Sequence, residues 1–176
     1  MKTYEFSVIA SGLDPEAEDF EARFYDGGCD DAIVAFQKGH VIVDFAREAE
    51  SIDAAISSAI ETVIAVGAKV ERVEPDPLVS LAEIAARTGM SRAAMSLYAK
   101  EQRAEGFPAP VAKVTSNSSL YDWASVASWL YRHKKISRET AIEAAVVKEA
   151  NEAIDAGAPQ MRDRLKRRAS ASDAEL

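Results

Sequence analysis

The segment 80–130 constrains the fold most, because its spacing predicts two short helices joined by a tight glycine turn. Ser80 and Glu83 have the spacing of a capping box, in which two side chains satisfy free backbone N–H groups at a helix start. Ala85 lies four residues before Gly89. Two helices that cross steeply need a small residue where they meet and a glycine where the backbone takes a positive φ. The pattern therefore predicts a helix-turn-helix.

The second helix of this pair has an apolar side and a basic side. Ser91 can cap its start, and Met95 and Tyr98 are spaced to face the first helix. The opposite side carries four polar or basic residues at steps of four, four and three, namely Arg92, Ser96, Lys100 and Arg103.

The basic side of the second helix predicts contacts with duplex DNA. With its first turn in the major groove, the helix can direct Arg92 to a guanine edge and Ser96 to a base or a phosphate. Lys100 and Arg103 can reach phosphates further along, and Ser91 belongs to the same predicted site. A solvated helix surface is the alternative, since basic residues at helical spacing are common on soluble proteins.

The residues that follow the second helix favour the DNA-binding interpretation. Residues 106–110 form a proline-rich extended corner, and two short apolar runs, 111–115 and 120–121, flank a polar turn. A hairpin at this place is a wing, with Lys113, Ser116 and Asn117 available to a phosphate backbone. A closing helix follows, in which the two tryptophans are expected to be core residues in one apolar stripe: Trp123, Val126, Trp129 and Leu130.

Residues 78–130 resemble the winged helix-turn-helix domains of the MerR-like, excisionase-type group, which are small bacterial and phage DNA-binding modules. The resemblance is carried by four groups of residues: 80–85, 89–91, 106–110, and Trp123 through Val126 to Trp129 and Leu130. It implies duplex DNA as the ligand and covers less than a third of the chain. One departure is the wing, because such wings often carry several arginines and 111–121 has Lys113 alone.

The charge is unevenly distributed along the 176 residues, whose net charge is −8. Residues 1–76 carry 17 acidic and 6 basic side chains, whereas 77–135 carry 4 acidic and 8 basic ones. The remaining 136–176 carry 8 acidic and 7 basic side chains. A basic segment joined to an acidic one is expected of a DNA-binding domain with a separate domain that does not bind DNA.

The first 76 residues predict an acidic sheet-and-helix domain. Six elements are expected in turn: a strand at 4–10, a helix from Asp14 through Phe20 and Phe24, strands at 32–36 and 41–45 joined by a hairpin, a helix with the stripe Ile52, Ile56, Ile60, Val63 and Ile64, and a strand at 70–73. The order βαββαβ predicts a ferredoxin-like domain, so the fold class is α+β. Residues 75–77 form the linker to a winged helix-turn-helix domain at 78–135.

The sequence predicts no enzyme, no metal and no cofactor. An acylphosphatase-type site needs an arginine and an asparagine together, and residues 1–76 contain no asparagine. His40 and His133 have no ligand-spaced cysteines or acids beside them. Asp26, Asp30 and Asp31 lack the spacing of a calcium loop, so a solvated acidic loop is expected.

The C-terminal part predicts a helix over 136–157 and a charged tail over 158–176. The helix has a mostly apolar stripe running from Ile142 to Ile154. It either packs on its own chain or pairs with another copy, and we predict pairing and hence a homodimer. The tail is expected to be a short helix that frays into disorder, with five basic residues that add nonspecific phosphate contacts or remain solvated: Arg162, Arg164, Lys166, Arg167 and Arg168.

Together these features predict a cytoplasmic, sequence-specific DNA-binding transcriptional regulator. The only cysteine, Cys29, excludes an intrachain disulfide, no apolar run is long enough for a membrane span, and Met1 leads into a strand rather than a signal peptide. The acidic domain then dimerises or receives a signal. Two alternatives stay open: an antitoxin-like autorepressor whose residues 1–76 bind a protein partner, and a regulator that senses a small ligand.

Overall fold

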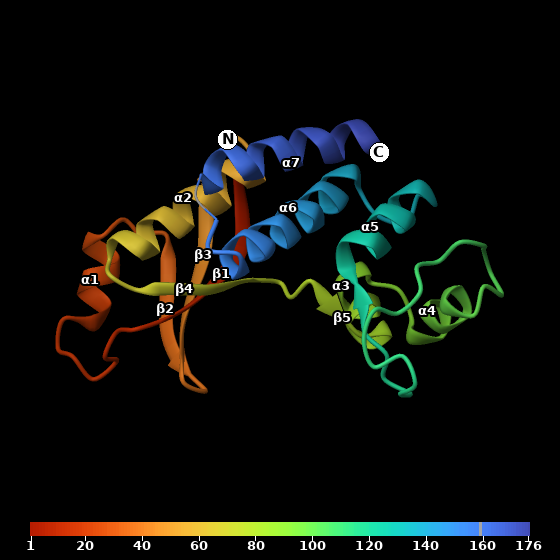
Figure 1. Cartoon of the computed structure of the whole chain (residues 1–176), viewed down its shortest axis with the longest axis horizontal. Helices are drawn as coiled ribbons and strands as arrows, with labels where there is room; N and C mark the ends of the chain where they lie inside the picture. Colours follow the sequence, from red (N-terminus) through yellow and green to blue (C-terminus); the bar gives the residue numbers. More distant parts are fainter. Residues whose placement is uncertain (159) are drawn as a thin grey trace. The chain divides into compact units, whose positions relative to one another are not determined.

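The computed structural model describes residues 1–158 and 160–176 and has a mixed α+β fold (Figure 1). The chain divides into two compact units. The first unit comprises 1–75 and 146–171, and the second comprises 76–145 and 172–176. The division after Pro75 falls in the predicted linker, whereas the return of 146–171 to the first unit has no counterpart in the sequence analysis.

The first unit contains a four-stranded antiparallel sheet with the order β2-β3-β1-β4. Its strands are β1 (Lys2–Ser11), β2 (Ala32–Gln37), β3 (His40–Ala49) and β4 (Lys69–Glu74). Lys38 and Gly39 join β2 to β3 and both have positive φ, 52° and 81°, as a two-residue hairpin turn requires. The expected alternation of buried and exposed side chains along the strands is confirmed, since Val8, Val43 and Val73 are completely buried on one face of the sheet.

Two helices, α1 (Phe20–Asp26) and α2 (Ile52–Ala65), pack against this sheet. Phe20 and Phe24 are buried, as predicted. The predicted start of this helix at Asp14 is wrong, because the Asp14 carboxylate accepts a hydrogen bond from the Glu16 N–H and closes a turn, and the helix begins six residues later. The predicted stripe of α2 is buried except for Ile64, which is 55% exposed.

Arg47 is a buried cation inside the first unit. Its guanidinium makes two hydrogen bonds to the Asp31 carboxylate, at 2.7 and 2.9 Å, and donates to the Gly28 carbonyl at 2.7 Å. It also donates to the hydroxyls of Ser58 and Thr62 and lies over the Phe45 ring. These contacts offset the desolvation of the charge and connect β3 to the loop after α1 and to α2.

The helix α6 (Arg138–Asp155) contributes to both units and closes an edge of the sheet. The Asn151 side chain accepts from the Val73 N–H at 2.8 Å and donates to the Val73 carbonyl at 2.9 Å. The prediction that the stripe of this helix pairs with another copy is wrong, because the chain itself buries it. The buried apolar residues are Ala141, Ala144 and Ala145 in the second unit and Val146, Val147, Ala150 and Ala153 in the first.

The predicted charged tail forms a further helix, α7 (Met161–Glu175). Leu165 is completely buried, and Arg162 and Arg164 pair with Glu61 and Glu149 in the first unit. These contacts, which involve Arg162 and Arg164, hold a segment whose composition predicts fraying. Pro159, within the segment predicted as a tail, lies outside the described residues.

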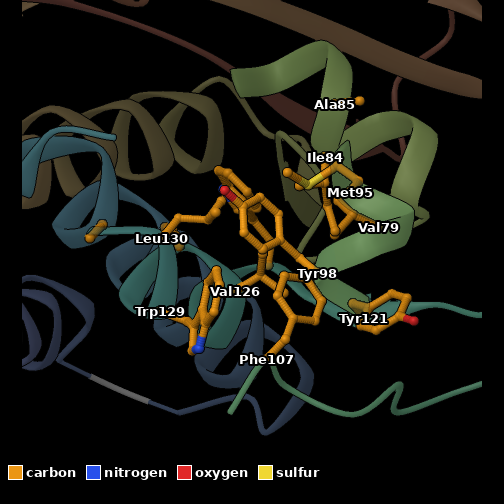
Figure 2. Close-up of a cluster of buried hydrophobic side chains, with 14 of the residues drawn as sticks. Val79, Ile84, Ala85, Met95, Tyr98, Phe107, Tyr121, Val126, Trp129 and Leu130 are labelled. Atoms are coloured by element: carbon orange, nitrogen blue, oxygen red, sulfur yellow. The ribbon is translucent and has the colours of Figure 1, made fainter. Parts of the chain in front are cut away.

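The second unit is built around one core from three short helices, the start of α6 and a small sheet. The helices are α3 (Leu81–Thr88), α4 (Arg92–Ala99) and α5 (Trp123–Arg132), and β5 (Leu78–Val79) pairs with β6 (Tyr121–Asp122). Figure 2 shows Tyr98, Phe107 and Trp129 packed together in this core, where the ring of Trp129 lies edge-on to both others. Trp123 and Trp129 are both buried, so the prediction that they are core residues is confirmed.

Candidate nucleic-acid interface

The turn between α3 and α4 follows the local chemistry of its residues. Ser80 and Glu83 form the predicted capping box, with the Glu83 carboxylate 2.6 Å from the Ser80 nitrogen. Gly89 has φ 69° and ψ 12°, a left-handed conformation. A Cβ at this position would meet no atom within 4 Å, so the requirement for glycine comes from the backbone angle and not from crowding. Ile84 and Met95, both completely buried, connect the two helices.

The outer side of α4 carries three of the predicted site residues. Arg92 and Lys100 are exposed and Ser96 is half-buried, whereas Met95 and Tyr98 are buried on the other side. Ser91 is the N-cap, and its hydroxyl oxygen accepts a hydrogen bond from the Ala94 N–H at 3.0 Å. The structure therefore gives Ser91 a role in capping the start of α4, beside the exposed side of the helix.

Arg103 does not lie on the helix, and this prediction is corrected. The helix ends at Ala99 with Lys100 as its C-cap, and Arg103 follows in the loop after it. Its guanidinium lies 5.7 Å from the centre of the Tyr98 ring. The loop itself is held by the Trp129 indole, which donates to the Glu105 carbonyl at 3.2 Å.

The predicted wing is a loop with little strand character. Ala112 and Leu120 form a single bridge, and Tyr121 pairs with Val79 rather than with the predicted strand 111–115. The hydroxyl of Ser119 closes the turn by donating to the carbonyls of Lys113 and Ser116, at 3.1 and 3.0 Å. This local bonding competes with a ladder, which explains the shortened hairpin.

The side chains at the tip of the wing remain exposed. They are Lys113, Ser116 and Asn117, and the Ser116 hydroxyl accepts from the Ser118 N–H. Two exposed valines, Val111 and Val114, lie in the same loop. The wing therefore presents one cation and several small polar groups, on a different segment from the α4 residues.

A basic run at the end of α5 was not among the predicted site residues. Arg132, His133, Lys134 and Lys135 are all exposed. A chain of ring contacts connects this run to the end of α4: His133 stacks on Trp129 at 3.7 Å between centroids, Trp129 contacts Tyr98 at 5.3 Å, and Arg103 lies over Tyr98. Four consecutive basic residues were visible in the sequence, but only the folded core connects one of them, His133, to Arg103 through two aromatic rings.

The first unit carries a groove lined by several acidic residues. A groove of about 730 Å³ on the sheet face opposite α2 is lined in part by Glu5, Asp44 and Glu74. In the described part of the chain no group of three or more histidines, cysteines or acids is arranged to hold a metal ion. Cys29 is buried, and burial raises the pKa of its thiol.

The chain matches no protein-family model, no curated protein and no solved structure. No helix within residues 1–158 and 160–176 is long and apolar enough to cross a membrane. The interpretation of the exposed basic surface therefore depends on its own geometry and charge.

Proposed function

We propose that this chain is a cytoplasmic, homodimeric transcriptional regulator that binds specific sequences in duplex DNA through the second unit. The observation that carries the proposal is the exposed side of α4, with Arg92, Ser96 and Lys100 directly after a left-handed glycine turn. A short helix whose polar side is exposed and whose apolar side is anchored in a core can enter the major groove.

The same features support a relationship in fold. We infer that the second unit is a winged helix-turn-helix domain of the MerR-like, excisionase-type group, with a short wing around Lys113. The first unit, whose elements follow the order βαββαβ, is inferred to be ferredoxin-like. Supporting observations are the capping box at Ser80, Gly89 and the buried tryptophans of α5.

The basic run at the end of α5 extends the proposed DNA surface. Phosphate contacts orient a DNA-binding domain and supply most of its affinity that does not depend on sequence. The wing has one lysine, whereas Arg132, Lys134 and Lys135 are exposed next to His133, which the aromatic contacts described above connect to Arg103. We infer that these cations make phosphate-backbone contacts of the kind that arginine-rich wings make in similar domains.

A second candidate function is the antitoxin-like one, in which the first unit binds a basic protein while the second represses transcription. The observation that favours it is the acidic groove lined by Glu5, Asp44 and Glu74. Co-purification with a small basic protein that an Asp44→Lys variant no longer retains would support this function.

Gel-shift assays of the full chain against a genomic fragment library test the main proposal. Arg92→Ala should weaken binding to selected fragments by about 1–3 kcal/mol relative to random DNA, because an arginine on a guanine edge discriminates between bases. Lys100→Ala should weaken all fragments alike. Lys166→Ala, which removes an exposed cation of α7, is the matched control. Wild-type protein that binds no fragment at low salt would refute the proposal.

The α5 run is tested separately by the salt dependence of binding. Replacing Arg132, Lys134 and Lys135 together by glutamine should reduce the slope of log K against log salt by about 2–3, since each lost phosphate contact removes about 0.9. An equal charge change at three exposed cations outside the second unit, Lys69, Lys166 and Arg167, should leave the slope unchanged. Equal slopes in both triple variants would remove the α5 run from the interface and leave the α4 proposal intact.

A further inference from the structure

The two edge strands of the sheet in the first unit, β4 and β2, differ in what covers their outer side. At β4 the outer edge is covered, because the Asn151 amide hydrogen-bonds to both the N–H and the carbonyl of Val73. At the other edge β2 has a neighbouring strand, β3, on one side only. The sheet therefore has one edge that a side chain closes and one edge that a further strand can join.

The register between β2 and β3 determines which backbone groups of β2 point outward. The Asp31 carbonyl accepts a hydrogen bond from the Ala46 N–H, so the odd-numbered residues of β2 bond to β3. Ala32, Val34 and Phe36 consequently direct their N–H and carbonyl groups away from the sheet. The Ala32 N–H is already bonded to the Cys29 carbonyl, which leaves the groups of Val34 and Phe36 as the centre of the edge.

The composition of β2 lacks the features that usually protect an edge strand. Its six residues contain no charge and no proline, whereas natural edges commonly carry lysines, prolines or bulges. Ile33 is 74% exposed and Phe36 is 50% exposed. Beside them lies a groove of about 550 Å³ between α1 and β2, whose lining includes Tyr25, Cys29 and Ala32.

We propose that β2 pairs antiparallel with β2 of a second copy of this chain, about a two-fold axis at Val34. An outward-directed residue must face another outward-directed residue, so even-numbered positions pair with even-numbered ones. With Val34 facing its own counterpart, Ala32 faces Phe36 of the second copy and Ile33 faces Ala35. The two sheets then form one eight-stranded antiparallel sheet.

This register matches size and charge at each pair of positions. A small residue faces a large one on both faces of the sheet, and the Phe36 ring of the second copy comes to the groove beside Ala32, on the face that α1 covers. Just beyond each end of the paired strands, the register brings Asp30 close to Lys38 in the hairpin turn of the second copy. Opposite charges at the ends and an uncharged centre are what self-association of an acidic unit requires.

Sedimentation equilibrium of the full chain, without DNA, tests the interface. Wild type should be a dimer at about ten micromolar, and Val34→Pro should raise the dissociation constant at least about tenfold by removing two hydrogen bonds at the axis. The substitution spares β2–β3 pairing, since that N–H faces outward and proline is tolerated at such edge positions. Val34→Thr, which keeps the N–H, is the control and should dimerise like wild type.

Charge reversal tests the register with variants that do not disturb the strand. Asp30→Lys or Lys38→Asp alone should weaken dimerisation about three- to tenfold, because each creates two pairs of like charges. The double variant should return to within about twofold of wild type. A monomeric wild type at a hundred micromolar, or a double variant as weak as the single ones, would overturn the proposal. This interface rests on the homodimer in the proposed function, so a monomeric wild type would refute the homodimer but not the proposed DNA binding. Failure to bind DNA would leave this interface standing.

Discussion

The two units use charge in opposite ways. In the first unit the central cation, Arg47, is buried and makes hydrogen bonds with its carboxylate, carbonyl and hydroxyl partners, while the groove on the open sheet face is acidic. In the second unit the apolar core is small and aromatic, and cations such as Arg92, Lys100 and Lys134 stay at the surface. Burying a charge stabilises a fold only when it is paired, whereas an exposed charge remains available to a polyanion. The difference supports the proposals that the first unit mediates assembly and that the second contacts phosphates.

The strongest test of this division is Trp129→Ala. The substitution removes the ring that Tyr98 and Phe107 contact and should destabilise the second unit by about 3–5 kcal/mol. Both tryptophans of the chain lie in the second unit, so the fluorescence of the remaining Trp123 reports unfolding of that unit alone. In urea we expect the fluorescence transition to move and the sheet signal in circular dichroism to persist. Loss of both signals together would show that the units unfold as one.

The reciprocal test is Asn151→Ala. It leaves the N–H and carbonyl of Val73 without their partner in a buried place, which should cost the first unit about 2–4 kcal/mol. Circular dichroism should register an earlier transition while tryptophan fluorescence stays close to wild type. Glu152→Ala, an exposed neighbour on the same helix, serves as the control and should change neither signal.

A smaller effect is expected from Ser80→Ala in the second unit. It removes one half of the capping box at the start of α3 and should cost about 1 kcal/mol, measured by the fluorescence transition in urea. Ser170→Ala, at an exposed position of α7, is the matched control. An unchanged transition in Ser80→Ala would mean that tertiary packing alone holds the helix start.

The smallest change concerns the reactivity of Cys29. Burial raises the pKa of its thiol, against the lowering effects of the Thr62 hydroxyl and the Arg47 charge, and Asp31 and Asp30 raise it further. At pH 8 the folded chain should react with a thiol reagent at least about tenfold more slowly than the chain in urea. Rapid labelling of the folded chain would mean that the loop after α1 opens readily.

Local patterns in the sequence predicted the second unit best. A capping box, a turn glycine and an apolar stripe each depend on residues within about one or two helical turns, so their physics is visible in a short window. Ser80, Gly89 and Trp129 occupy the expected places for that reason. The order of elements in the first unit was predicted from the same kind of evidence.

The features that escaped prediction depend on contacts between distant residues or on competition between local bonds. Asn151 gave no signal as an edge cap, because its partner Val73 is 78 positions earlier in the chain. The apolar stripe of α6 indicated burial but could not indicate which surface buries it. At the wing, hydroxyl bonds of Ser119 replace strand pairing, and Arg103 follows a helix that ends four residues earlier.

The Asn151 contact also determines when the first unit can finish folding during synthesis. Residues 1–75 leave the ribosome first, but the amide that covers the β4 edge follows 78 residues later. At a translation rate of 5–20 residues per second, the β4 edge remains unpaired for about 4–16 seconds while residues 76–145 of the second unit are made. During that interval both edge strands of the nascent sheet, β2 and β4, can accept a further strand. Nascent chains on neighbouring ribosomes of one messenger RNA can therefore pair wrongly through β4. Fragments that stop before α6 keep this vulnerability permanently.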